Sequence, residues 1–329
     1  MIAAMISKVI GLLYKSPLSN IIGSLGMGYT SLAQNAYMIL LMIASFSIPQ
    51  AVSKLISERI ALKDYRNAHK FFKGAMIYAM VIGGVVGLFC LFGAGLIIPQ
   101  NQKDAIPALQ ILAPTIFLSG ILGVFRGYFQ AYRNMMPTSI SQIIEQVFNA
   151  VISIVGASVL FGIGTKAGKK SGEELLGPAY GAAGSTLGTV VGSLSGLLFL
   201  LFVIFLYKNV IRKQLKRDRT QNVESYSFLL KALLLTAIPV VFSTAVYNIN
   251  QIIDLTIFNH VMESQGYVEK EYMALQGIYT GKYDTLINVP MAIANALGTS
   301  LVPSLTAVVT AGTKKQVHSR LTRLYVLQW

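Results

Sequence analysis

Long apolar runs limit what this chain can fold into. Residues 75–98, 140–163 and 187–207 are nearly free of charge, and each run has about the ~20 residues that a helix needs to cross the hydrocarbon core of a membrane. Inside lipid, every backbone N–H and C=O group must find a partner within the protein, which a helix provides on its own. The runs therefore predict an all-α polytopic membrane protein.

Composition agrees with a chain that faces lipid over most of its surface. The protein is 54% hydrophobic and 12% charged, with a mean hydropathy of +0.60, whereas an ordinary soluble domain is roughly 25% charged. The net charge of +14 lies in short segments between the apolar runs. This scatter argues against nucleic acid as a partner, because a nucleic-acid site gathers basic residues on one face.

The positions of Lys and Arg predict the orientation in the membrane. The apolar pattern predicts eight spans and the beginning of a ninth near Gln316, and most basic residues follow the even-numbered spans. Loops rich in Lys and Arg stay in the cytoplasm, so we expect a multi-pass protein of the bacterial cell membrane with a cytoplasmic N-terminus. The predicted spans are 2–23, 31–55, 71–98, 106–132, 138–163, 179–207, 228–258 and 277–311.

A short internal repeat suggests two related lobes. Pro49 and Pro290 each lie within a span and are followed by small and aliphatic residues, and six spans separate them. Parallel six-helix repeats are a known transporter plan, although chance or a general use of proline kinks would also explain so short a match. We expect a first lobe at 1–207, a basic cytoplasmic linker at 208–227 and the beginning of a second, pseudo-symmetric lobe at 228–329. Pro49 and Pro290 are candidate hinges, and the unpaired ninth span predicts that the sequence is a piece of a longer protein.

Several spans carry polar or ionisable side chains on one helical face. A charge at the bilayer centre costs ~2.5–3.5 kcal/mol even on the more lenient scale, so such residues usually face a cavity or a partner. Polar contacts between helices are one alternative, and a lysine near a span end can also reach the headgroups. The candidates are Lys8 and Lys15 in span 1, Lys54 in span 2, Gln142 and Glu145 in span 5, Asn250 and Asp254 in span 7, and Lys282 in span 8.

Other kinds of site have little support in the sequence. Five glycines spaced three or four residues apart in span 6, beginning at Gly181, predict close helix packing, and no strand precedes them as a nucleotide-binding loop would need. The histidines His69, His260 and His318 lie in separate loops, so neither a metal site nor another cofactor is expected. No catalytic constellation stands out, and we do not expect an enzyme.

Several short segments together resemble a known transporter group. They are Ser7-Lys8 with Gly11 and Tyr14-Lys15, Ile48-Pro49 through Leu55, Arg126 through Gln146, Gly277-Ile278-Tyr279, and Leu301-Val302-Pro303-Ser304. On these residues the chain resembles the polysaccharide-biosynthesis branch of the multidrug/oligosaccharidyl-lipid/polysaccharide exporter superfamily. The group most similar to it is the MurJ-type lipid II flippases and stage V sporulation protein B-like proteins of Gram-positive bacteria.

The resemblance implies a V-shaped transporter of two six-helix lobes that flips an undecaprenyl-diphosphate-linked saccharide, above all lipid II, to the outer leaflet for cell-wall peptidoglycan synthesis and cell shape. It implies a cationic cavity lined by Lys8, Lys15 and Lys282. These are lysines where the family often has arginines, which keeps the charge but loses the bidentate geometry. Lys54 is a further candidate contact for the diphosphate. Glu145 and Asp254, with Gln142 and Asn250 beside them, would pair with the bases or bind a coupling cation.

Three other functions are alternatives to lipid II transport. An exporter of another polysaccharide, teichuronic or spore-cortex precursor would use the same fold, and the sequence does not separate the two. A cation-coupled drug exporter should have an acidic cavity, against which the three lysines argue. A membrane glycosyltransferase would need large outer loops, and the longest predicted outer loops are only 163–178 and 259–276.

Overall fold

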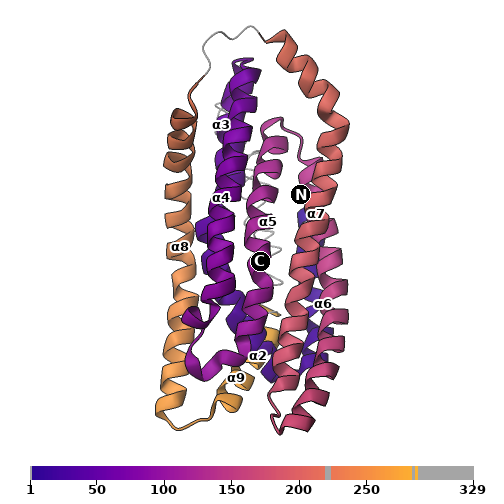
Figure 1. The fold of residues 1–329 in the computed structure, drawn as a ribbon, viewed down its shortest axis with the longest axis vertical. Helices are drawn as coiled ribbons and strands as arrows, with labels where there is room; N and C mark the ends of the chain where they lie inside the picture. The colour runs from indigo at the N-terminus through magenta and orange to yellow at the C-terminus, as the bar shows by residue number, and fades with distance from the viewer. Residues whose placement is uncertain (1, 219–223, 284–285, 288–329) are drawn as a thin grey trace, which may run out of the picture.

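In the part of the chain that the structure describes, most helices are long and run roughly along one common axis (Figure 1). The computed structural model describes residues 2–218, 224–283 and 286–287, and this part contains no strand. The prediction of an all-α membrane protein is therefore confirmed. The helices are α1 (Ile2–Leu13), α2 (Lys15–Leu41), α3 (Ile48–Ala61), α4 (Tyr65–Ile97), α5 (Ile106–Ala131), α6 (Met136–Ser171), α7 (Leu176–Arg217), α8 (Tyr226–Ser264) and α9 (Glu269–Ile278).

Shorter helical turns join some of these helices. A π-helical turn, η1 (Met42–Phe46), connects α2 to α3, a 3₁₀ turn, η2 (Gln100–Ala105), precedes α5, and a second π-helical turn, η3 (Tyr279–Tyr283), continues α9. A π-helical turn lacks the regular i to i−4 hydrogen bonds and often bends a helix. The break between α2 and α3 comes just before Pro49, which lies in the first turn of α3.

Five segments of the described chain are long and apolar enough to cross a membrane: Val9–Ala61, Tyr65–Ile97, Gln102–Ala131, Met136–Ser171 and Leu176–Lys216. The last four correspond to predicted spans 3 to 6. The first covers most of predicted spans 1 and 2, because residues 24–30, left between those two spans in the prediction, are helical. Predicted span 7 falls on α8. Most of predicted span 8, all of span 9, and Pro290 lie outside the described residues.

The helices extend further than the apolar pattern predicted. The predicted outer loop 163–178 is wrong, since α6 continues to Ser171 and α7 begins at Leu176. On the other side, α7 runs through the basic residues 208–217, which the prediction assigned to a linker. Lys, Arg, Gln and Leu are good helix formers, and cations favour the C-terminal end of a helix dipole, so this helix persists beyond its apolar part.

Gly23 interrupts α2 near the predicted end of span 1. Its φ of 71° and ψ of 177° lie in a region that is essentially restricted to glycine. A Cβ at this position would meet no other atom within 4 Å. The backbone conformation, and not the space around it, is therefore what requires glycine here.

Helices α6 and α7 pack through the predicted glycine ridge. A Cβ on Gly184 would overlap the backbone of Gly156, and one on Gly188 would overlap Ser153. Small residues let two helix backbones approach closely, which is how membrane helices gain packing energy without a hydrophobic driving force. The prediction that these glycines serve helix packing is confirmed.

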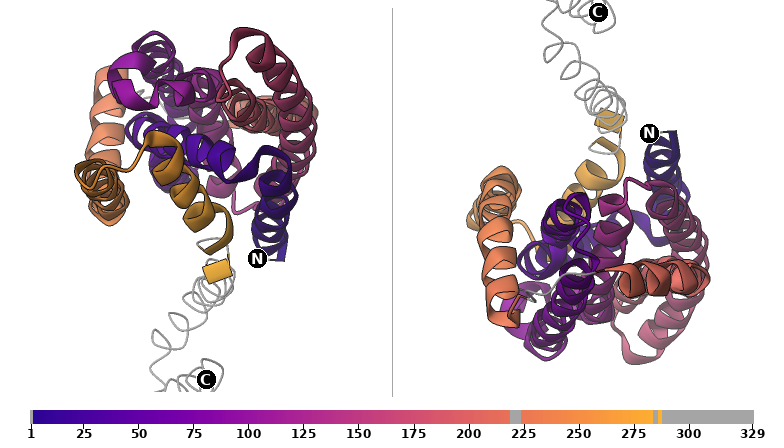
Figure 2. Two further views of the ribbon diagram at one scale, coloured as in Figure 1. Left: turned by 90° about the horizontal axis from the view of Figure 1, so that it is seen from below. Right: turned by 90° about the horizontal axis from the view of Figure 1, so that it is seen from above.

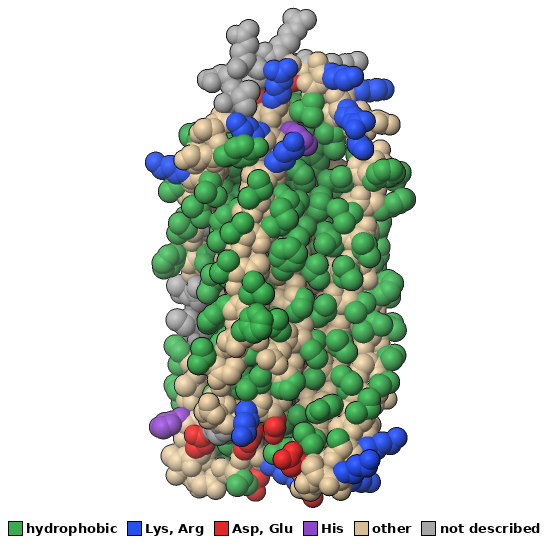
Figure 3. Space-filling view, in the orientation of Figure 1, with side chains coloured by type: hydrophobic (Ala, Val, Ile, Leu, Met, Phe, Trp, Pro, Cys, Tyr) green, Lys and Arg blue, Asp and Glu red, His purple; other side chains and the backbone are tan. Residues whose placement is uncertain are grey.

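The surface has an apolar belt between two charged ends (Figure 3). Large apolar side chains such as Phe92 and Leu96 are more than 80% exposed in the isolated chain, at 81% and 86%. Lys and Arg gather at the upper end in this view, where α3, α4 and α7 have their basic residues, whereas acidic and basic side chains mix at the lower end. Exposed apolar area on this scale marks a surface for lipid.

Candidate functional site

A largely buried ion pair joins α5 to α6. The Nη2 atom of Arg126 on α5 is 2.6 Å from Oε2 of Glu145 on α6, and the two side chains are only 16% and 21% exposed. Arg126 Nε also donates to Ser141 Oγ at 3.1 Å, and Ser193 Oγ on α7 donates to Glu145 Oε1 at 3.2 Å. Three helices therefore share one charged, hydrogen-bonded group.

Polar contacts continue from this pair along the α6–α7 contact. Ser153 Oγ donates to the backbone oxygen of Ser185 at 2.7 Å, and Ser185 Oγ lies 3.2 Å from Thr30 Oγ1 on α2. We call this set, from Arg126 and Glu145 to Ser153, Ser185 and Thr30, the polar seam. Its members satisfy one another inside the helix bundle, so the seam joins α2, α5, α6 and α7.

The polar seam changes the interpretation of the stripe predicted on span 5. Glu145 was expected to pair with the lysines or to bind a cation, but in the described structure it pairs with Arg126. Arg126 was named only in the segment that carries the family resemblance, and no partner was expected for it. Arg126 lies five residues before the end of α5, and α6 begins after a short turn. The first turns of α6, which contain Ser141 and Glu145, therefore lie beside Arg126, and this spacing could have indicated the pairing. Gln142 lies on the same helix and is partly buried.

The structure brings Lys15 and Lys282 onto neighbouring segments. Lys15 begins α2, and Lys282 belongs to η3, which packs against α2. A Cβ on Gly281 would lie 3.7 Å from Ser19 Oγ, one helical turn after Lys15. Neither Lys15 nor Lys282 takes part in the ion pairs that join Arg59 to Glu224, Arg126 to Glu145 and Lys270 to Glu174. Lys8 lies on α1, which packs against α6.

The remaining predicted residues lie elsewhere in the fold. Lys54 is exposed on α3, whose main packing partners are α4, α5 and α8. Asp254 is exposed on α8, and Asn250 lies one turn earlier on the same helix. Pro49 packs against α5, since a Cβ on Gly127 would come within 2.7 Å of the Pro49 carbonyl oxygen.

An acid–tyrosine contact closes the end of the bundle opposite the basic end. Helix α9 runs antiparallel to α2, and Cβ atoms on Gly28 or Gly277 would overlap the facing backbone. Beside this contact, Tyr29 Oη donates to Glu269 Oε1 at 3.2 Å. Burial raises the pKa of the Glu269 carboxyl, and Asp104 adds to the effect by its negative charge. Sequence reasoning did not find this pair, and no local pattern marks it.

Residues 1–309 match the polysaccharide biosynthesis protein family. The chain is 24% identical to the lipid II flippase MurJ of Bacillus subtilis, over 96% of this chain and 58% of that protein. It is 26% identical to stage V sporulation protein B of the same organism, over 92% of this chain and 56% of the relative.

The fold has a solved counterpart. A MOP superfamily transporter from Pyrococcus furiosus superposes with a TM-score of 0.53 at 14% identity, covering 96% of this chain and 71% of that one. The likeness at this identity concerns the fold alone. The chain thus spans a little over half the length of the curated relatives it matches. With the family match over residues 1–309, the chain belongs to the polysaccharide biosynthesis protein family of multi-pass membrane proteins.

Proposed function

We propose that this chain forms the first lobe and the beginning of the second lobe of a flippase for an undecaprenyl-diphosphate-linked saccharide, with lipid II as the substrate. The lobe boundaries are those expected from the sequence, 1–207 and 228–329, joined by the cytoplasmic segment 208–227. The relative named as a lipid II flippase supports this substrate. The proposed activity is transport, and no chemical step on the substrate is part of it.

The observation that carries the proposal is the approach of the Lys15 and Lys282 segments. A lipid-linked diphosphate has an anionic head and a long apolar tail, so it needs a basic pocket that opens toward lipid. Lys15 on α2 and Lys282 on η3 belong to different proposed lobes, and their segments pack against each other. With Lys8 on α1, they would hold the diphosphate as point charges. Lys54 would receive the head near the cytoplasmic surface.

Alternating access would move the two lobes about Pro49 and Pro290. The contact between α2 and α9 keeps the outer ends of the two lobes together, so the described arrangement fits a state that is closed toward the outside, with the N-terminus in the cytoplasm. Asp254 and Asn250 on α8 are the proposed contacts for a coupling ion. Glu145 is paired with Arg126. It would therefore affect transport only indirectly, by stabilising the packing of the first lobe.

Complementation tests this assignment directly. A strain depleted of its lipid II flippase would receive the protein with all of its natural sequence, and lipid II reaching the outer face would be measured. We expect Lys15→Ala and Lys282→Ala to abolish rescue while the proteins still accumulate in the membrane. Lys166→Ala, a change at an exposed lysine on α6, serves as the matched control. If both Ala variants rescue growth and lipid II export, the cavity assignment is wrong.

A second candidate is the export of a spore-cortex or other polysaccharide precursor on the same fold. The family description, polysaccharide biosynthesis protein, and the match to a sporulation protein favour it. Rescue of the flippase-depleted strain separates the two candidates. An exporter of another precursor would leave lipid II on the inner face, although the same lysines would still be needed for its own lipid-linked substrate.

A further inference from the structure

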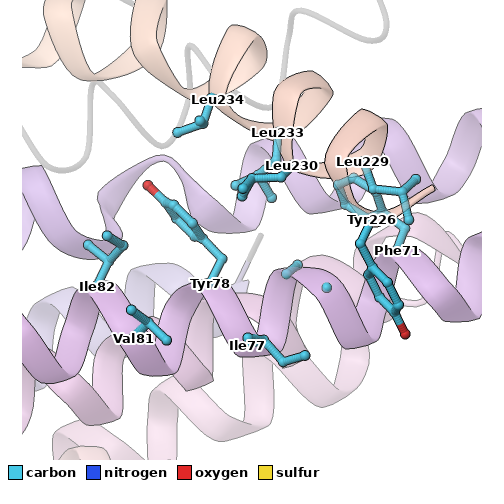
Figure 4. A pocket seen from close by; sticks show the side chains of 12 residues that line it. Phe71, Ile77, Tyr78, Val81, Ile82, Tyr226, Leu229, Leu230, Leu233 and Leu234 are labelled. Carbon is cyan, nitrogen blue, oxygen red and sulfur yellow. The ribbon is translucent and has the colours of Figure 1, made fainter.

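We propose that the groove between α4 and α8 is a binding site for an anionic phospholipid of the leaflet at the Lys-rich end of the bundle. The groove has a volume of about 520 Å³. Its lining is apolar apart from two tyrosine hydroxyls, and Tyr78 projects between the two helices midway along it (Figure 4). This site is separate from the Lys15–Lys282 region. The groove lies near the beginnings of α4 and α8, whereas α9, which η3 continues, lies at the opposite end of the bundle (Figure 1). Helices α1 and α8 also lie on opposite sides of the bundle (Figure 2).

The shape of the groove fits one acyl chain. Its floor is buried, with Phe71, Leu229 and Leu233 at 1 to 2% exposure, whereas its rim residues Ile77 and Val81 are 54% and 56% exposed. The groove therefore opens sideways toward lipid. From Phe71 to Ile82, α4 rises by about 17 Å at ~1.5 Å per residue. This length is close to the depth of one leaflet, about half of a ~30 Å hydrocarbon core.

Two lysines stand above the groove where a headgroup would lie. Lys70 and Lys73 come four residues before the lining residues Gly74 and Ile77, on the same faces of α4. Side chains on a helix point toward its N-terminus, here the charged end, and long lysines extend further to reach the headgroups. The Nζ of Lys70 lies 4.7 Å from the centre of the Tyr226 ring on α8. None of the three described ion pairs uses either lysine.

The two walls of the groove are tied together just above it. Arg59 Nε on α3 donates to Glu224 Oε2 at 2.9 Å, immediately before α8, and the Glu224 backbone N–H donates to Asn67 Oδ1 of α4 at 2.9 Å. This clamp fixes the beginning of α8 against α4. The groove is therefore preformed, and Lys70 and Lys73 lie at the end where a headgroup would bind. These two cations favour a lipid with a negative headgroup over one with a zwitterionic headgroup.

Fluorescence quenching can measure the occupancy of the groove. The single tryptophan of the chain, Trp329, would be replaced by Phe, and Tyr78→Trp would supply a reporter inside the groove. The protein would be placed in bilayers containing either phosphatidylglycerol or phosphatidylcholine with brominated acyl chains. We expect phosphatidylglycerol to quench with the higher relative association constant, by about fivefold for each lysine that it engages.

Two independent variants test the site. Lys70→Gln combined with Lys73→Gln should bring the ratio of the association constants for phosphatidylglycerol and phosphatidylcholine close to one. The control combines Lys208→Gln with Lys213→Gln, at exposed residues of α7, and should leave this ratio unchanged. Gly74→Leu should fill the groove and reduce quenching by both lipids. Its nearest neighbour is Tyr226, and a Cβ there would be at an ordinary 3.5 Å.

Each outcome bears on the proposal. It is overturned if both brominated lipids quench equally in the parent protein, or if the Lys70/Lys73 variant keeps the full preference. It is also overturned if undecaprenyl diphosphate displaces the brominated phosphatidylglycerol at a lower mole fraction than phosphatidylglycerol itself does, since the groove would then belong to the transported lipid. Loss of the preference in the lysine variant, with the α7 control unchanged, supports it.

Discussion

The ion pair between Arg126 and Glu145 should be strongly coupled. Both side chains are mostly buried, at 16% and 21% exposure, and the closest atoms are 2.6 Å apart. Removing one partner of a buried pair leaves an uncompensated charge and costs ~3–5 kcal/mol. Because some water still reaches both groups, we expect the lower end of this range, about 3 kcal/mol, for either Glu145→Met or Arg126→Met.

The double variant should be far less destabilised than the sum of the two single changes. With both charges replaced by methionine, no buried charge is left unpaired, and an apolar pair of similar volume is often neutral or stabilising. The coupling free energy in the cycle should therefore be at least about 3 kcal/mol, and about 6 kcal/mol if the double variant is as stable as the parent. Equilibrium unfolding in mixed micelles of dodecyl maltoside and SDS, followed by energy transfer between labels on α5 and α6, would measure it.

A matched pair in the same chain provides the control. Lys270 and Glu174 are 3.0 Å apart, but their side chains are 61% and 82% exposed, so their coupling should stay below about 1 kcal/mol. Additive effects of the Arg126 and Glu145 variants would refute the reasoning. So would a change in the ion dependence of transport in Glu145→Gln but not in Arg126→Met, since Glu145 would then bind the coupling ion itself.

Further predictions concern the helix breaks and contacts. Gly23→Ala should destabilise the protein by about 1–3 kcal/mol through backbone strain. Gly162→Ala, in open space on α6, should instead stabilise it by up to ~1 kcal/mol. Thermal unfolding of the two variants in micelles would measure both changes in stability. By the same measurement, Gly184→Ala should cost about 1–3 kcal/mol by forcing α6 and α7 apart, and Gly196→Ala, whose nearest contact would be 3.3 Å away, should cost less. Because the pKa of Glu269 is raised when α9 lies on α2, that contact should be most stable in acid and should weaken as pH rises through the raised pKa. Spin labels on α2 and α9 should report this opening, and Glu269→Gln should remove its pH dependence.

The sequence predicted the fold class well because the signal is local. A run of apolar residues long enough to span lipid has to be helical, whatever it packs against. The ends of the helices were less predictable. The basic stretch after Tyr207 was assigned to a linker for its charge, yet it continues α7 to Arg217. Charge indicates where a span leaves the membrane, but helix propensity decides where the helix ends.

The candidate site was predictable only where its chemistry lies within one helix. Glu145 stood out as a carboxylate in an apolar span, but its partner Arg126 depends on the α5–α6 hairpin. The contact of Tyr29 with Glu269 joins residues 240 positions apart. No periodicity within a helix encodes such a pairing, because it depends on how α9 returns to α2 after the whole of α8.

The structure separates two uses of polar residues that the sequence could not distinguish. The polar seam satisfies its own groups: Glu145 has Arg126 and Ser193, and Ser153 has the backbone of Ser185. Such a group gains little from a passing ligand, since the ligand would have to replace contacts already made. Lys15 and Lys282 differ, because no ion pair in the described part of the chain compensates them. A charge held near lipid without such a partner is costly, and an anionic substrate would remove that cost on binding. The same physical argument therefore favours a structural role for the seam and supports the proposal that the lysines bind the transported anion.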